Sequence, residues 1–215
     1  MKGNIIFLKG RNKAGNLVFY TKGGIQMARG IAETVNNPRT PAQVAQRARF
    51  GAIVAMSKGF GITLKKSLAP QDDARVSARN WFYKLNKNLT MTITSGVVSN
   101  ISYSDVKIST GDVVNCAWAT PDFETSYHIK VQIDAANDDP TFSPATDDCN
   151  IIAYCPALQQ ALIGSVKRVT GQKVDITTPR YWQGQQVYLY SFCSRGGDYP
   201  TVCSDSEYVG SGEVA

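Results

Sequence analysis

The chain has 215 residues, of which 43% are hydrophobic and 19% are charged, and its net charge is +6. These proportions are typical of a globular protein and exclude a disordered one. Its apolar runs are too short to span a bilayer, and the N-terminus lacks the long apolar region of a signal peptide. We therefore expect no membrane partner, and we expect the chain to be made and kept in a cytoplasm.

The charge is distributed unevenly. Residues 1–90 contain 16 Lys or Arg and three acids, whereas residues 91–215 contain seven basic residues and 14 acids. This asymmetry predicts two parts with different partners. We predict a basic N-terminal module over residues 1–90 and an acidic domain over residues 91–215. The alternative is two solvated faces without a partner, because a charge pattern steers association without defining it.

Residues 4–30 are predicted to form a small β-meander. Apolar runs at 5–8 and 17–20 flank a turn rich in Gly and Asn, and residues 25–29 alternate like a third strand. A small sheet with few apolar side chains is marginally stable in water. We therefore expect this sheet to pack on a neighbouring molecule.

Two helices are predicted to follow the meander. Thr40 and Gln43 form a capping box with Pro41 at the first helical position, which predicts a helix over residues 44–58. A second helix is predicted over residues 72–85, because its acids lie near the start and its lysines near the end, as the helix dipole favours.

From about residue 90 the pattern changes to short strands separated by turns. The candidate strands are residues 91–93, 106–108, 113–118, 127–133, 150–154, 165–169, 173–176 and 187–192. This spacing is typical of an immunoglobulin-like sandwich. We predict an α+β fold, in which an N-terminal β-hairpin or meander and two helices precede an immunoglobulin-like antiparallel β-sandwich.

The sequence contains no recognisable catalytic arrangement, so we predict that the protein is not an enzyme. His128 is the only histidine, and it lies on an alternating strand where we expect it to be solvated. Neither a nucleophile elbow nor a Walker A loop occurs. We predict no cofactor.

Metal binding is not predicted either. The five cysteines have irregular spacings without a CxxC pair, which predicts reduced, partly buried thiols rather than a zinc site. A weak calcium site formed by Asp138, Asp139, Asp147 and Asp148 is an alternative, although these acids lack EF-hand spacing.

The predicted subunit-interface residues lie in the basic half. They are Lys9, Arg11, Lys13, Arg29, Arg39, Arg47, Arg49 and Phe50. We expect the first helix to expose Arg47 and Arg49 beside a stripe of small residues. Clustered cations also suit nucleic-acid phosphates, but no recognised nucleic-acid motif occurs, so binding of nucleic acid stays an alternative.

Three signatures occur in the chain, two of them close together and the third much later. They are PRTPAQ at residues 38–43, QRARF at 46–50 and SDSEYVG at 204–210. The chain resembles an uncharacterised β-sandwich family of Bacteroidota proteins and of the crAss-like tailed phages that infect those bacteria. The phage members look like ring proteins of the tail, and the family has no catalytic residues to carry over.

The resemblance implies a non-enzymatic structural protein of a tailed bacteriophage virion, assembled in the host cytoplasm. We expect a homo-oligomeric closed ring in the tail or portal region, in contact with other tail and portal proteins. Complementary basic and acidic halves are one way to build the repeated heterologous interface of a ring. The alternatives are a nucleic-acid-binding accessory protein and a bacterial surface or carbohydrate-binding β-sandwich.

Overall fold

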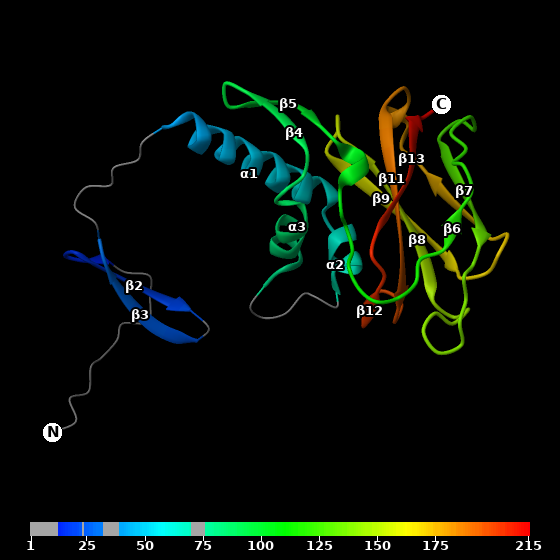
Figure 1. Cartoon of the computed structure of the whole chain (residues 1–215), viewed down its shortest axis with the longest axis horizontal. Coiled ribbons are helices and arrows are strands. Elements are labelled where there is room, and N and C mark those ends of the chain that lie inside the picture. Colours follow the sequence, from blue (N-terminus) through cyan, green and yellow to red (C-terminus); the bar gives the residue numbers. More distant parts are fainter. Residues whose placement is uncertain (1–12, 23, 32–38, 70–75) are drawn as a thin grey trace. The chain divides into compact units, whose positions relative to one another are not determined.

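The computed structural model describes residues 13–22, 24–31, 39–69 and 76–215. These residues form three α-helices, two short 3-10 helices and thirteen strands (Figure 1). The helices are α1 (Pro41–Phe60), α2 (Thr63–Ser67) and α3 (Ala78–Asn86), and the 3-10 helices are η2 (Tyr103–Asp105) and η3 (Arg180–Trp182). The strands are β1 (Lys13–Ala14), β2 (Leu17–Lys22), β3 (Ile25–Gly30), β4 (Met91–Thr94), β5 (Val97–Ile101), β6 (Ala117–Trp118), β7 (His128–Ala135), β8 (Asp148–Cys155), β9 (Gln160–Lys167), β10 (Lys173–Thr177), β11 (Gln186–Arg195), β12 (Val202–Cys203) and β13 (Glu207–Glu213).

Residues 1–40 form the first compact unit, which we call the hairpin unit. It contains the antiparallel sheet β1-β2-β3, in which Lys22 pairs with Ile25 next to the turn. Gly24 in this turn has a φ of +79°, a conformation that glycine adopts without strain. The strands predicted at 17–20 and 25–29 are confirmed, whereas the run at 5–8 lies outside the described residues.

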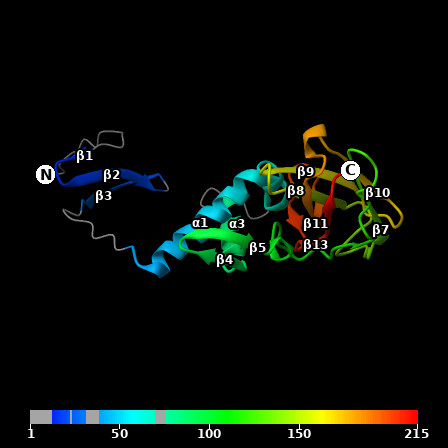
Figure 2. The same cartoon turned by 90° about the horizontal axis from the view of Figure 1, so that it is seen from above.

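Residues 41–215 form the second compact unit. Its largest sheet has the order β12-β11-β8-β9, with β13 also paired to β11, and a smaller sheet has the order β10-β7-β6. Strands β4 and β5 form a separate hairpin. The helices lie on one side of the five-stranded sheet and β6 and β7 lie on the other (Figures 1 and 2).

Side chains alternate along β8 and β11 and so reach both faces of the five-stranded sheet. Ile151 and Leu189 face the three-stranded sheet and share a core with Ile129 of β7. Tyr154 faces the helices and shares another core with Phe60 of α1. The five-stranded sheet is therefore the middle layer of this unit.

The predicted domain boundary at residue 90 does not coincide with the division of the structure, which falls between Thr40 and Pro41. The physical reason is helix packing, because Phe60 of α1 and Phe82 of α3 are buried in the same core as Phe192 of β11. The change of charge near residue 90 therefore occurs inside one packed unit.

The helices begin and end close to their sequence signals. Helix α1 begins at Pro41, as predicted, and it ends just before Gly61, whose φ is +53°. Helix α3 begins at Ala78, later than the predicted start, and residues 70–75 lie outside the described part of the chain. Helix α2 was not predicted, because five residues are too few to show a helical period.

Most predicted strands after residue 90 are present. Those at 91–93, 127–133, 150–154, 173–176 and 187–192 correspond to β4, β7, β8, β10 and β11. The prediction at 165–169 is displaced, since β9 covers Gln160–Lys167. The prediction at 106–108 is wrong, and only β6 forms within 113–118. The α+β class is confirmed by these sheets and helices.

Candidate functional site

Four of the eight predicted interface residues lie before residue 31. Lys9 and Arg11 lie outside the described residues. Lys13 of β1 and Arg29 of β3 both pair with Val18 of β2, one from each side. The backbone register therefore places Lys13 and Arg29 opposite the same residue of β2.

One face of this sheet combines apolar and basic residues, and we call it the hairpin face. It contains Val18, Tyr20, Lys22, Ile25, Met27 and Arg29. Ile25 is 68% exposed and Met27 is 41% exposed. Among its described residues, the hairpin unit has no second layer that covers this face.

The other predicted interface residues lie at or near the first half of α1. Arg39 and Arg47 are exposed. Arg49 is half-buried, and its Nη1 atom donates a hydrogen bond to the carbonyl of Leu89. Arg49 is therefore not exposed as expected, because its guanidinium is hydrogen-bonded to the segment before β4.

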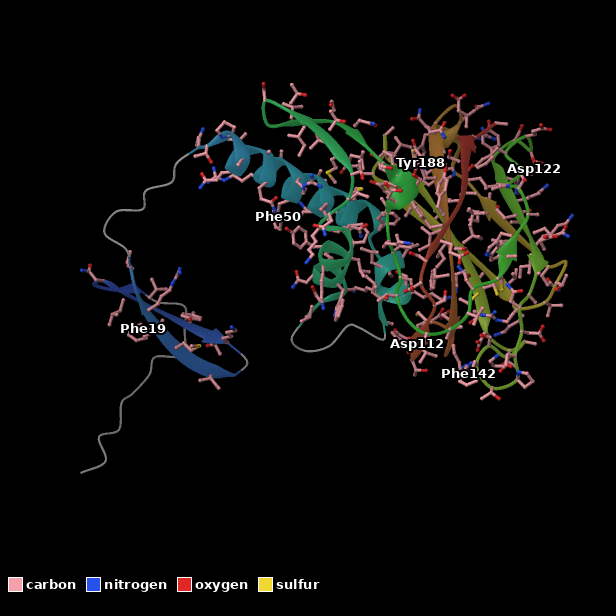
Figure 3. The ribbon with its side chains drawn as sticks, in the orientation of Figure 1. Phe19, Phe50, Asp112, Asp122, Phe142 and Tyr188 are labelled. Atoms are coloured by element: carbon pink, nitrogen blue, oxygen red, sulfur yellow. The ribbon has the colours of Figure 1, made fainter. Side chains whose placement is uncertain are left out.

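Phe50, which is labelled in Figure 3, is 50% exposed. Its ring packs edge-to-face with the ring of Tyr83 of α3, and the ring centroids are 5.1 Å apart. Phe50 lines a hollow of about 280 Å³ between α1 and α3. The exposed cations Lys58 and Arg79 also line this hollow. Aromatic rings beside cations suit an acidic or aromatic side chain of a protein partner.

The acids of residues 91–215 are spread over the surface. Twelve of the 14 are exposed, and Asp112 and Asp122 lie well apart in Figure 3. In the described part of the chain, ion pairs engage Asp147, Asp148 and Asp175. Asp175 pairs with the predicted solvated His128, which is only half-exposed, at 2.7 Å between Oδ1 and Nδ1.

Three of the four acids of the alternative calcium site have other partners. Asp147 is buried and its Oδ1 lies 2.8 Å from Arg195 Nε, while Asp148 Oδ1 lies 2.7 Å from Lys167 Nζ. Asp139 accepts backbone hydrogen bonds from Phe142 and Thr141, which lower the pKa of its carboxyl group. Among the described residues, these four acids do not gather as a group of metal ligands.

Three cysteines converge in the core between the two sheets. Cys149 of β8 and Cys193 of β11 are direct cross-strand partners, and Cys116 immediately precedes β6 of the other sheet. The Sγ atom of Cys116 lies 2.8 Å from that of Cys149 and 3.6 Å from that of Cys193. The Sγ atoms of Cys149 and Cys193 lie 3.4 Å apart. We call these three residues the thiol cluster, and each is at most 1% exposed.

Contacts inside the thiol cluster shift the pKa values of its three thiols in different directions. Hydrogen bonding with Cys149 and with Cys193, helped by the nearby positive charge of Arg168, lowers the pKa of Cys116. The same hydrogen bonding to Cys116 raises the pKa of Cys149. Hydrogen bonding to Cys116 also raises that of Cys193. The thiolate is the form of a cysteine that binds soft metals or attacks a disulfide.

The guanidinium of Arg168 lies next to the thiol cluster and is completely buried. It donates hydrogen bonds to the carbonyl of Val114 at 2.6 Å and to that of Ala136 at 3.0 Å. The Cys116 thiol donates to the same Ala136 carbonyl at 3.4 Å. Within the described residues, Arg168 Nε has no hydrogen-bond partner and no carboxylate pairs with this guanidinium.

Sequence reasoning missed the thiol cluster. Cys116 and Cys149 are 33 positions apart, and Cys149 and Cys193 are 44 positions apart. Only the pairing of β8 with β11 and the packing of the second sheet bring them together. Cys149 and Cys193 do belong to strands that are buried along almost their whole length, and the apolar residues beside them were the one signal that the two thiols lie in a core.

Comparison with known proteins identifies one match. The model of a Family of unknown function (DUF6266) matches residues 8–210, which include most of the hairpin unit and nearly all of the second unit. No curated protein matches the chain, and no solved structure matches it. Among the described residues, no helix has the length and apolar character needed to cross a membrane.

Proposed function

We propose that this chain, which belongs to the Family of unknown function (DUF6266), is a non-enzymatic structural protein that assembles with copies of itself. The hairpin face carries this proposal. Its apolar members Ile25 and Met27 are exposed on a sheet whose described part has no covering layer. Contiguous exposed apolar side chains with charged neighbours are characteristic of protein-binding surfaces.

The charges support a contact between unlike surfaces. Residues 1–40 contain seven Lys or Arg and one acid, whereas residues 41–215 contain 16 residues of each sign. The acids of the second unit are concentrated after residue 90, where they outnumber basic residues by 14 to seven. We infer that the hairpin face of one copy binds the acidic strand region of the next, with opposite charges setting orientation and rate.

A contact between two different surfaces of one chain closes into a ring when it repeats around an axis. We propose such a closed homo-oligomeric ring in the tail or portal region of a tailed-phage virion, in contact with other tail and portal proteins. The sequence signatures at 38–43, 46–50 and 204–210 support this setting by their resemblance to phage ring proteins. Assembly then takes place in the host cytoplasm.

We further propose that the two packed sheets form an immunoglobulin-like sandwich. Their antiparallel pairing and their shared core of Val131, Leu189 and Trp182 support this arrangement. Sandwiches of this kind serve as rigid bodies whose edges and loops carry contacts.

Mass photometry of the full-length protein tests the assembly. The double variant Ile25→Ser and Met27→Ser should shift the particles from oligomer to monomer, because it removes apolar area from the contact. Ile62→Ser is a matched control, since Ile62 is 77% exposed but lies in the second unit. If the double variant and the control assemble to the same mass, the hairpin face is not the interface.

Nucleic-acid binding is the second candidate function, and the excess of six positive charges in residues 1–40 favours it. A gel-shift series at rising salt separates the two functions, because phosphate contacts weaken steeply as salt rises. Retarded DNA or RNA bands at low salt that vanish at high salt support this candidate. Free nucleic acid at every salt concentration eliminates it.

A further inference from the structure

The thiol cluster has a geometry that separate protonated thiols do not adopt. Non-bonded carbon atoms have their optimal separation at about 3.5–4.0 Å, and sulfur is larger than carbon. The Sγ atoms of Cys116 and Cys149 are 2.8 Å apart, well inside that range. Both atoms lie in the buried layer between the two sheets. A shared bonding partner or a covalent bond is therefore needed to hold them there.

The surrounding charge distinguishes a shared cation from a covalent bond. Arg168 brings a buried positive charge that no carboxylate among the described residues pairs with. A buried charge is costly unless an opposite charge compensates it. A disulfide between Cys116 and Cys149 is neutral and would leave Arg168 uncompensated. Three thiolates around a divalent cation carry one net negative charge, which Arg168 neutralises.

We propose that Cys116, Cys149 and Cys193 bind a divalent thiophilic cation of the zinc class, with Arg168 as the neighbouring counter-charge. Zinc–sulfur bonds of about 2.3 Å in tetrahedral geometry place the sulfur atoms about 3.8 Å apart. The Sγ–Sγ separations of 3.4 and 3.6 Å that involve Cys193 are close to that value. The Sγ atoms of Cys116 and Cys149, now 2.8 Å apart, would move apart by about 1 Å when the cation binds. Binding releases the protons of the three thiols to solvent.

Asn115 supplies the fourth ligand. Its Oδ1 atom accepts hydrogen bonds from the Cys116 N–H at 3.0 Å and from the Cys193 thiol at 3.3 Å. Its Nδ2 atom donates to Ser191 Oγ at 3.0 Å, which fixes the amide with its oxygen toward the cluster. Three thiolates and one oxygen complete a closed four-coordinate site. The cation would tie β8 and β11 to the opposite sheet, so its role is structural and independent of the assembly proposed above.

Metal analysis of the reduced full-length protein tests this site. After incubation with Zn²⁺ and removal of the excess, the wild type should retain about one zinc per chain. The variant Cys149→Ser should lose it. Cys155→Ser is the matched control, because Cys155 is equally buried on the same strand and outside the cluster, and it should retain the zinc. Zinc retained by Cys149→Ser, or absent from the wild type, overturns the proposal.

Cobalt spectroscopy tests the site on the wild-type protein, so its result does not depend on whether a variant folds. Co²⁺ added to the reduced wild type should produce the intense visible bands of tetrahedral thiolate coordination, and Zn²⁺ should displace them. A colourless protein contradicts the proposal. An intact mass lower by two hydrogens after purification without reductant also contradicts it, because it shows that a disulfide exists where the cation was proposed.

Discussion

Phe60, the last residue of α1, stacks on Tyr154 of β8 with ring centroids 4.3 Å apart and ring planes 16° apart. Phe60 is 1% exposed and Tyr154 is 2% exposed. This stacked pair joins the helical layer to the middle sheet. It explains why the helices and the strands form one compact unit, so that the change of charge near residue 90 does not mark a domain boundary.

Replacing Phe60 should therefore unfold the whole second unit more easily. Phe60→Ala removes a fully buried ring and should lower the free energy of unfolding by about 3–5 kcal/mol. Phe142→Ala is the control, because Phe142 is 70% exposed, and it should change stability by less than about 0.5 kcal/mol. Urea denaturation followed by circular dichroism measures both. Equal stability of the two variants would mean that helices and sheet do not share a core.

Gly164 of β9 has no room for a side chain. A Cβ atom there would lie 2.5 Å from Val174 Cγ1 and 2.9 Å from Ile176 Cγ1, so Gly164→Ala should cost about 1–3 kcal/mol by overpacking. Gly51→Ala in α1 is the opposite case, because no atom outside the neighbouring backbone of α1 lies within 4 Å of its Cβ position. It should stabilise the helix by about 0.5–1 kcal/mol. Thermal melts should therefore shift in opposite directions, and a shift in the same direction refutes the packing at β9.

Arg49 should contribute to folding rather than to assembly. Arg49→Ala removes the hydrogen bond to the Leu89 carbonyl and should lower the free energy of unfolding by about 1–3 kcal/mol. Arg180→Ala serves as the comparison, since Arg180 is exposed and no salt bridge involves it among the described residues. Chemical denaturation ranks the two variants. An Arg49→Ala protein as stable as wild type, but unable to oligomerise, reverses this assignment.

Alkaline pH should destabilise the fold through its buried tyrosines. Burial raises the pKa of Tyr190 and of Tyr154 above the ordinary tyrosine value. Below about pH 10 both groups are protonated in the folded and unfolded states, so they give no pH dependence. Above it, the unfolded chain releases these protons while the folded chain keeps them. The free energy of unfolding therefore falls as pH rises.

Urea midpoints measured from pH 8 to about pH 11 test this pH dependence. Tyr190→Phe should flatten part of the alkaline slope because it removes one titrating group. It also removes the hydrogen bond from Tyr190 to the Tyr103 carbonyl, so its stability at pH 8 should be lower. Identical alkaline slopes in wild type and variant contradict the role of Tyr190.

Several helices and strands could be predicted from sequence signals that involve only neighbouring residues. Thr40 and Pro41 marked the start of α1, because capping chemistry depends on neighbouring residues only. The alternation from His128 to Ile133 marked β7, because one side of that strand faces the core. Each of these two signals lies within a few consecutive residues, so the helix start and the strand could be predicted without knowledge of tertiary contacts.

Other features depend on contacts that no local pattern records. Strand β13 contains Gly212, whose Cβ position lies 2.6 Å from the Phe123 ring, so glycine there reflects a distant neighbour rather than a turn. The division between Thr40 and Pro41 was missed because charge, on which the predicted boundary rested, does not report packing. The thiol cluster was missed because three separate segments supply its sulfur atoms.

Negative-stain imaging of the purified full-length protein, combined with mass photometry, is the decisive test of the closed homo-oligomer. A ring should give particles of one size, a fixed multiple of the 23.4 kDa chain, with a central opening. Their fraction should fall as salt rises, because the basic hairpin unit meets an acidic surface. A monodisperse 23.4 kDa particle at low salt and micromolar concentration would contradict the account.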